Sequence, residues 1–138
     1  MNLNIKIVDK IDYSKIYETL SHESSGGICI FIGTVRNMTR NELVHELFFE
    51  AYEAMAISEM EKIAKEAIVK WNLNKIIMHH VIGIKKAKEP VVIVGTSSAH
   101  RDACFEATRF LIDTLKRNVP IWKKEVFKNK KTWITNHP

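Results

Sequence analysis

A histidine and an arginine stand where an apolar segment passes into a helical pattern, in the stretch Ser97-Ser98-Ala99-His100-Arg101. The first turn of a helix exposes unpaired N–H groups at the positive end of the helix dipole, so cationic side chains there would strengthen an anion-binding site. Acidic residues are the usual choice in that turn, and the exception favours a functional role. A surface Arg101 paired with Asp102 or Glu106 explains the spacing equally well, so both interpretations stay open.

A second cation follows an apolar segment in the stretch Gly33-Thr34-Val35-Arg36. The planar guanidinium group suits bidentate contact with a phosphate. Taken alone, however, the pattern favours an arginine that is simply solvated in the polar loop 36–41.

Three lysines and a glutamate form a third group near the C-terminus. Lys116 falls in the last turn of a predicted helix, where the helix dipole favours a cation whatever the function. In the strand expected over 121–127, alternation places Lys123 and Glu125 on one face and Lys124 on the other. Only one of the two adjacent lysines can therefore enter a given pocket, and periodicity does not say which.

His79 and His80 would point to opposite faces of a strand, and we expect one to face the core and the other to face solvent. No Cys, Asp or Glu lies at ligand spacing from them, so we predict no metal site. Cys29 and Cys104 lie in apolar segments and are interpreted as small buried side chains. The sequence has no Ser-His-Asp order, Gly-rich phosphate loop or pair of catalytic carboxylates.

The elements that must position these residues are strands mixed with helices. Alternation and β-branched residues predict strands at 3–7, 28–35, 43–50, 75–82, 91–97, 121–127 and 132–135. Three- and four-residue apolar spacing predicts helices at 12–20, 52–71 and 99–118. We expect Ser97 or Ser98 to cap the last helix and Pro120 to end it. The order predicts an α+β fold with two long helices in a single domain over residues 1–138.

The charge of the chain is unevenly distributed. The 138 residues carry a formal net charge of +5, and residues 116–138 hold seven basic residues and one acidic residue. Residues 1–115 hold 14 basic and 15 acidic residues, so a uniformly basic surface is excluded and an anion-attracting region near the C-terminus is predicted. The N-terminus lacks a secretory signal pattern, and no apolar run could span a bilayer, which predicts a cytoplasmic protein.

Four motifs together resemble the catalytic (large) subunit family of molybdopterin synthase. They occur in that family's order and spacing, and they cover roughly residues 26 to 135. They are Phe31-Ile32-Gly33-Thr34-Val35-Arg36-Asn37, Glu50-Ala51-Tyr52-Glu53-Ala54-Met55-Ala56, Ser97-Ser98-Ala99-His100-Arg101 and Val119-Pro120-Ile121-Trp122-Lys123-Lys124-Glu125.

The resemblance implies an α/β hammerhead fold with a mixed or antiparallel sheet, and a sulfurtransferase without a cofactor. Such an enzyme takes sulfur from the C-terminal Gly-Gly thiocarboxylate of a small ubiquitin-like carrier and gives it to cyclic pyranopterin monophosphate, which forms the dithiolene of molybdopterin. The implied assembly is a homodimer with one carrier on each protomer, a heterotetramer. By resemblance, the catalytic residues are Lys116 and Lys123. The implied substrate-binding residues are Thr34, Val35, Arg36, His100, Arg101, Lys124 and Glu125.

Geometry adds one expectation to this resemblance. His100 and Lys116 are 16 residues apart on one predicted helix, or roughly 24 Å at about 1.5 Å per residue. They can hardly line the same small pocket of one chain, so a site that uses both would be shared between two copies. The alternative functions are a small nucleic-acid-binding domain that uses the lysine-rich C-terminal hairpin on phosphates, and a pure assembly subunit.

Overall fold

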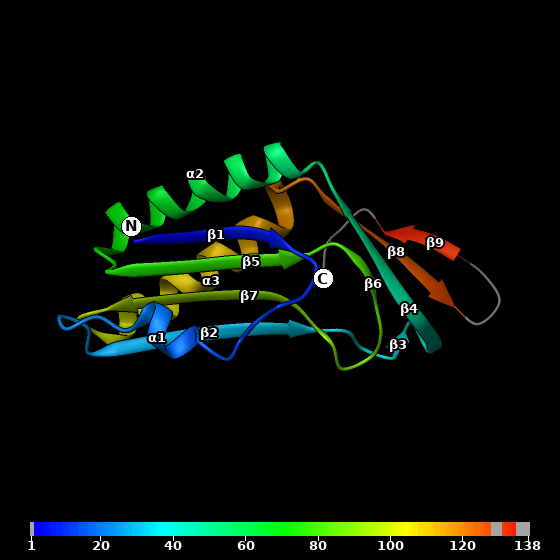
Figure 1. Cartoon of the computed structure of the whole chain (residues 1–138), viewed down its shortest axis with the longest axis horizontal. Coiled ribbons are helices and arrows are strands. Elements are labelled where there is room, and N and C mark those ends of the chain that lie inside the picture. The colour runs from blue at the N-terminus through cyan, green and yellow to red at the C-terminus, as the bar shows by residue number, and fades with distance from the viewer. Residues whose placement is uncertain (1, 128–130, 135–138) are drawn as a thin grey trace.

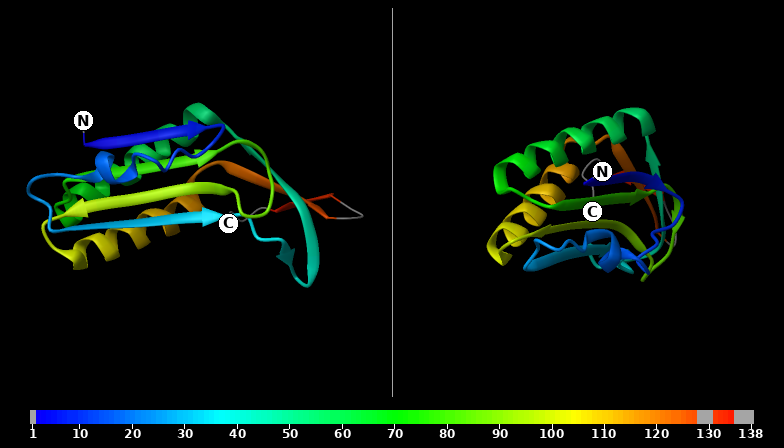
Figure 2. Two further views of the ribbon diagram at one scale, coloured as in Figure 1. Left: turned by 60° about the horizontal axis from the view of Figure 1, so that its bottom comes forward. Right: turned by 60° about the vertical axis from the view of Figure 1, so that its left-hand side comes forward.

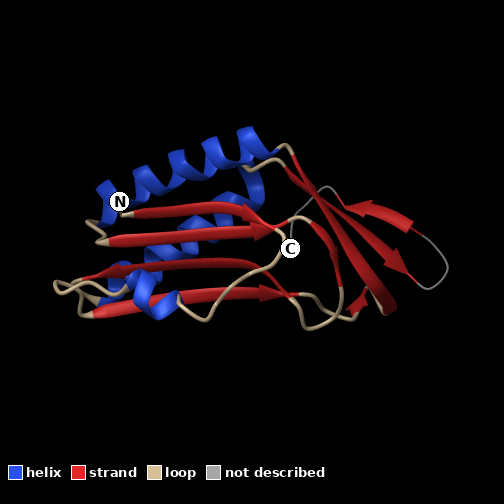
Figure 3. Cartoon of the chain, viewed as in Figure 1, coloured by secondary structure: helices blue, strands red, loops and turns tan. Residues whose placement is uncertain are grey.

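The computed structural model describes residues 2–127 and 131–134, and these residues form nine strands and three helices (Figures 1 and 3). The strands are β1 (Leu3–Val8), β2 (Gly27–Thr34), β3 (Met38–Thr39), β4 (Glu42–Ala51), β5 (Lys75–Val81), β6 (Gly83–Lys85), β7 (Pro90–Ser98), β8 (Ile121–Phe127) and β9 (Lys131–Ile134). The helices are α1 (Ile16–Leu20), α2 (Glu53–Trp71) and α3 (Arg101–Asn118). The predicted α+β class with two long helices is confirmed.

The first sheet has the strand order β1-β5-β7-β2. β1 and β5 are parallel, whereas β5 with β7 and β7 with β2 are antiparallel. β7 lies inside the sheet and is buried from Val91 to Ser98, as its nearly continuous apolar sequence predicted. β2 lies at the edge, and its outer side pairs with no other strand of the described chain.

Helices cover the two faces of this sheet unequally, with α2 and α3 on one face and α1 on the other (Figures 1 and 2). Adjacent residues of β7 show the division, because side chains alternate along a strand. The Oγ1 of Thr96 contacts the Oγ1 of Thr108 on α3 at 3.0 Å. On the other face, a Cβ built on Gly95 would lie 2.6 Å from the Cδ1 of Leu20, which is the last residue of α1. Glycine at that position leaves the space that Leu20 fills.

A second sheet is steeply inclined to the first (Figure 1), with the order β3-β4-β8-β9 and with β6 paired to β4. Its register sets Leu47 opposite Glu125 and Phe48 opposite Lys124. Leu47 and Glu125 are buried, whereas Phe48 and Lys124 are only partly buried, so the sheet has an inner and an outer face. The sheet therefore separates Lys123 and Glu125 from Lys124, as alternation predicted.

Two short elements were missed from the sequence. β3 lies within the predicted loop 36–41, where Arg40 and Asn41 have φ values of 51° and 66° and form the two-residue turn of a β3–β4 hairpin. Both central residues of a type I′ turn need a positive φ, and Arg is an unusual choice for one of them. β6 has three residues, too few to show a two-residue period.

The predicted serine cap of the second long helix is wrong. His100 is the N-cap residue, and it makes no side-chain capping hydrogen bond. The hydroxyl of Ser98 instead donates to the carbonyl oxygen of His100 at 2.6 Å. Ser97 and Ser98 are still part of β7, whose pairing with β2 holds them in the sheet.

Two predictions of burial also need correction. Both histidines are buried. His79 forms a 2.7 Å hydrogen bond with Asn4 of β1, and the ring of His80 packs edge-on against that of Phe49, with the ring centroids 5.1 Å apart. Cys104 is buried as predicted, but Cys29 is only partly covered because it lies on the edge strand β2. Within the described residues, no helix is long and apolar enough to cross a membrane.

Candidate functional site

A pocket of about 490 Å³ lies where the end of β2, the C-terminal part of α3 and the inner face of the β4–β8 pair meet. Three cations line it from three different parts of the chain. Arg36 follows β2, Lys116 lies near the end of α3, and Lys123 lies on β8. Thr34, Thr39 and Glu125 complete its polar lining. The site is thus strongly cationic, with one carboxylate.

Lys123 and Glu125 are the buried charges of this pocket. Two residues apart on β8, they share its inner face, and the Nζ of Lys123 lies 3.7 Å from the Oε1 of Glu125. The side chain of Lys123 is 10% exposed and that of Glu125 is 3% exposed. The second carboxylate oxygen, Oε2, has no hydrogen-bond partner among the described residues. Burying a charged pair at the wall of a pocket costs free energy unless other groups satisfy its hydrogen bonds. Buried charges of this kind are common at functional sites.

The surroundings of Lys123 lower the pKa of its ammonium group below the usual value of 10.5. Burial is the largest cause, because it penalises the charged form. Glu125 opposes this effect, while the positive charges of Arg36 and Lys116 add to it. Burial, and to a smaller extent the two neighbouring cations, therefore bring the pKa of Lys123 closer to the pH range in which a lysine can exchange a proton.

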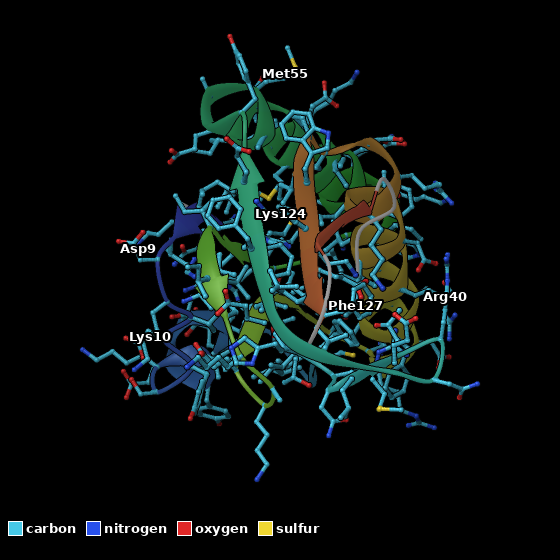
Figure 4. All side chains as sticks on the ribbon, turned by 90° about the vertical axis from the view of Figure 1, so that its right-hand side faces the viewer. Asp9, Lys10, Arg40, Met55, Lys124 and Phe127 are labelled. Carbon is cyan, nitrogen blue, oxygen red and sulfur yellow. The ribbon has the colours of Figure 1, made fainter. Side chains whose placement is uncertain are left out.

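Five of the nine residues predicted to act in the site line the pocket. They are Thr34, Arg36, Lys116, Lys123 and Glu125. Val35 lies outside it, since its side chain is 5% exposed within the core and its backbone N–H and C=O bond to the loop before β7. Lys124 also lies outside it. Its Nζ stands 5.3 Å from the ring centroid of Phe48, and in Figure 4 the side chain lies between β4 and β8.

His100 and Arg101 are exposed at the opposite end of α3 from Lys116 and do not line this pocket. They adjoin the start of β2, where a Cβ built on Gly27 would lie 3.5 Å from the Cα of Arg101. The expected separation of His100 from Lys116 within one chain is therefore confirmed.

Six further residues of the lining were not predicted from the sequence. They are Phe31, Ile32, Gly33, Leu47 and Val92, with the polar Thr39 from β3. The first three precede Thr34 on a predicted strand, so their nearness was available from the sequence. Leu47 and Val92 could not be found in that way. They belong to strands that reach the pocket only through the pairing of β4 with β8 and of β2 with β7.

The fold and the site define a small α+β protein with a cationic pocket beside a buried lysine. Comparison with known proteins is specific: the model of the MoaE protein family matches residues 7–118, and the chain belongs to this family. The predicted membership of the molybdopterin synthase catalytic subunits is thereby confirmed, and the nucleic-acid-binding alternative is set aside.

Individual relatives agree with this assignment. The molybdopterin synthase catalytic subunit of Culex quinquefasciatus is 43% identical over 120 residues, which cover 86% of this chain and 76% of that protein. The crystal structure of molybdopterin synthase from Staphylococcus aureus matches with a TM-score of 0.89 and 29% identity, and 97% of each chain is covered. A complex of subunits 1 and 2 of the molybdopterin-converting factor from Helicobacter pylori matches with a TM-score of 0.75 over 98% of this chain and 91% of that chain. At 24% identity, this last match shows the fold alone.

Proposed function

We propose that this chain transfers sulfur from the C-terminal thiocarboxylate of a small ubiquitin-like carrier to cyclic pyranopterin monophosphate, which forms the dithiolene of molybdopterin. The observation that carries the proposal is the convergence of Arg36, Lys116 and the buried Lys123 on one pocket. Both reactants are anions, one a cyclic phosphate and the other a thiocarboxylate. A pocket with three cations attracts both and offsets their mutual repulsion.

Within this pocket, Lys123 has the position of a catalytic residue. Its charge is little screened because water is largely excluded, so an ammonium group there would polarise the thiocarboxylate carbonyl more strongly than an exposed lysine would. Lys116 is partly exposed at the same pocket and could hold the phosphate together with Arg36. The apolar lining from Phe31, Leu47 and Val92 offers a surface for the flat pterin ring system.

The homodimer is part of the same proposal. Ile30, Phe31 and Ile32 are about 40% exposed at the centre of the edge strand β2. An edge strand with apolar side chains and unpaired backbone groups is a ready surface for pairing with a second copy. Antiparallel pairing of two β2 strands about Phe31 would set Val35 opposite the partner's Gly27.

This pairing would complete the pocket. Because Gly27 adjoins the start of α3, the same two-fold axis would bring the partner's His100 and the partner's Arg101 toward Arg36. Each pocket would then use lysines of one copy and the helix start of the other. The exposed position of His100 and Arg101, outside the pocket of their own chain, supports this arrangement.

The carrier partner rests on family membership and on the Helicobacter pylori relative, which was solved as a complex of two subunits. One carrier on each protomer of a dimer would give a heterotetramer. A cytoplasmic location stays a prediction from the sequence.

Reconstitution tests the function directly. The purified protein is incubated with a thiocarboxylated carrier and cyclic pyranopterin monophosphate, and dithiolene formation is measured. Lys123→Ala should lower the rate by about 100-fold or more, as expected for loss of a preorganised charge in a dry site. Lys124→Ala is the matched control, because the neighbouring lysine lies over Phe48 on the outer face. Equal losses in the two variants, or a normal rate in Lys123→Ala, would contradict the proposed role.

A mixing experiment tests the shared site. Lys116→Ala and His100→Ala should each be inactive as homodimers. Mixed dimers should regain activity, because one of their two pockets keeps both residues. Absence of any recovery, when subunit exchange is demonstrated by mass spectrometry, would show that the two residues do not act in one pocket.

A further inference from the structure

Glu125 does not fit the role of a ligand for an anionic substrate. Its carboxylate is 3% exposed and lines a pocket otherwise dominated by cations. A negative charge there repels a phosphate, so its presence needs another explanation. The nearest charge is the Nζ of Lys123, at 3.7 Å from its Oε1.

We propose that Glu125 is a positioning residue, which keeps Lys123 protonated and directed into the pocket. The inference rests on the proposed sulfur transfer and deepens it, since it assigns the charge state in which Lys123 works. In this arrangement Glu125 touches neither reactant and acts only through Lys123.

The geometry of β8 makes the pair specific. Residues 123 and 125 project from the same face of the strand, so their side chains are neighbours regardless of how the other elements of the site are arranged. On β4, the residues opposite them are Phe49 and Leu47, which are buried and carry no charge. Glu125 is thus the anion that faces Lys123 from the paired strands β4 and β8, within the part of the chain that the structure describes.

The other charges around Lys123 make this anion necessary. Lys116 faces Lys123 from α3, and Arg36 faces it from the segment after β2. The positive charges of both residues destabilise the protonated form of Lys123. Lys85 of β6 pairs with Leu47 on the same inner face, but it contacts the carbonyl oxygen of Asp9 and lies 3.8 Å from Glu89. Without Glu125, a buried Lys123 beside two cations would give up its proton at a lower pH.

The test compares Glu125→Gln with the wild-type protein in two measurements. The first is the titration of the Lys123 side chain, followed by NMR of lysine labelled with ¹³C at Cε. Removal of the carboxylate should lower the pKa of Lys123 by at least about one unit, because an opposite charge at this distance favours the protonated form by at least that amount. This measurement needs no turnover, so it stands or fails separately from the proposed function.

The second measurement is the pH dependence of dithiolene formation. The alkaline limb of kcat should move to lower pH in Glu125→Gln by as much as the pKa of Lys123 falls, so that the loss of rate approaches about tenfold or more well above the limb and disappears well below it. The KM for the pterin should change less than threefold. Glu125→Asp keeps the charge with a shorter side chain and should shift the limb less, which preserves a test if the glutamine variant folds poorly.

Glu50→Gln is the matched control, because Glu50 is an exposed carboxylate of β4 that lies opposite Trp122 on the outer face. It should change neither the titration of Lys123 nor the pH profile. An unchanged Lys123 pKa in Glu125→Gln would overturn the inference. So would a raised KM at every pH with an unshifted alkaline limb, which would make Glu125 a substrate ligand. Absence of dithiolene formation by the wild-type protein would refute the function while leaving the titration result intact.

Discussion

The edge strand β2 allows the proposed dimer to be tested with one substitution, Ile30→Ser. Ile30 is 38% exposed, and it does not line the pocket. Full burial of an isoleucine side chain is worth about 1.5–3 kcal/mol, so burying the exposed fraction in an interface contributes about 0.6–1.1 kcal/mol. In a two-fold dimer the residue occurs twice, which raises the loss on substitution to about 1–2 kcal/mol, or roughly tenfold in the dissociation constant.

Analytical ultracentrifugation over a dilution series measures this dissociation constant. Activity per subunit should fall over the same concentration range, because a separated protomer lacks the partner's His100. Val69→Ser provides a matched control, since Val69 is 83% exposed on α2 and offers more apolar surface than Ile30. If both serine variants weaken the dimer equally, general surface hydrophobicity is responsible. If Ile30→Ser leaves the dissociation constant unchanged, β2 is not the interface.

Three further predictions concern stability. Burial lowers the pKa of His79 from 6.5 to about 4, so the unfolded chain binds more protons than the folded chain between these pH values. The free energy of unfolding should therefore fall by about 1–2 kcal/mol from pH 6.5 to pH 4, after allowance for solvent screening. In urea titrations, His79→Gln should flatten this dependence on pH. Gly26→Ala should destabilise the fold by about 1–3 kcal/mol, because the new Cβ would lie 2.3 Å from the carbonyl oxygen of Ala99; an unchanged denaturation midpoint would show that the backbone there adjusts freely. Leu20→Ala should cost about 2–4 kcal/mol, since the side chain is fully buried between α1 and the sheet, and a loss below about 1 kcal/mol would mean that α1 does not hold the sheet.

Local patterns predicted most of the regular elements. The two long helices and the longer strands lie within two residues of their predicted bounds, because each buries a face whose apolar spacing repeats along the chain. Elements of two or three residues, β3 and β6, are too short to carry such a repeat. They form because β4 offers them backbone partners, across a two-residue turn for β3 and from a distant part of the chain for β6.

Burial was harder to predict than secondary structure. The pair His79-His80 was expected to divide between core and solvent, but both faces of β5 are covered. The serines before α3 were expected to cap the helix, but β7 continues through both. In each case the deciding contact lies far away in the sequence, so a local rule gave the wrong answer.

The sequence by itself determined the α+β class, the family and the residue types of the site, and alternation along 121–127 already separated Lys123 and Glu125 from Lys124. Tertiary structure alone decided which of these two faces lines the pocket and that Val35 belongs to the core, whereas the separation of His100 from Lys116 already followed from their spacing on one helix. The physical reason is that a strand's period encodes its two faces locally. Whether a face is dry, charged or open depends on the inclination of one sheet to the other and on cations brought from β2 and α3. The lowered pKa of Lys123 is a property of that assembly, because burial and neighbouring charge arise only when the elements meet.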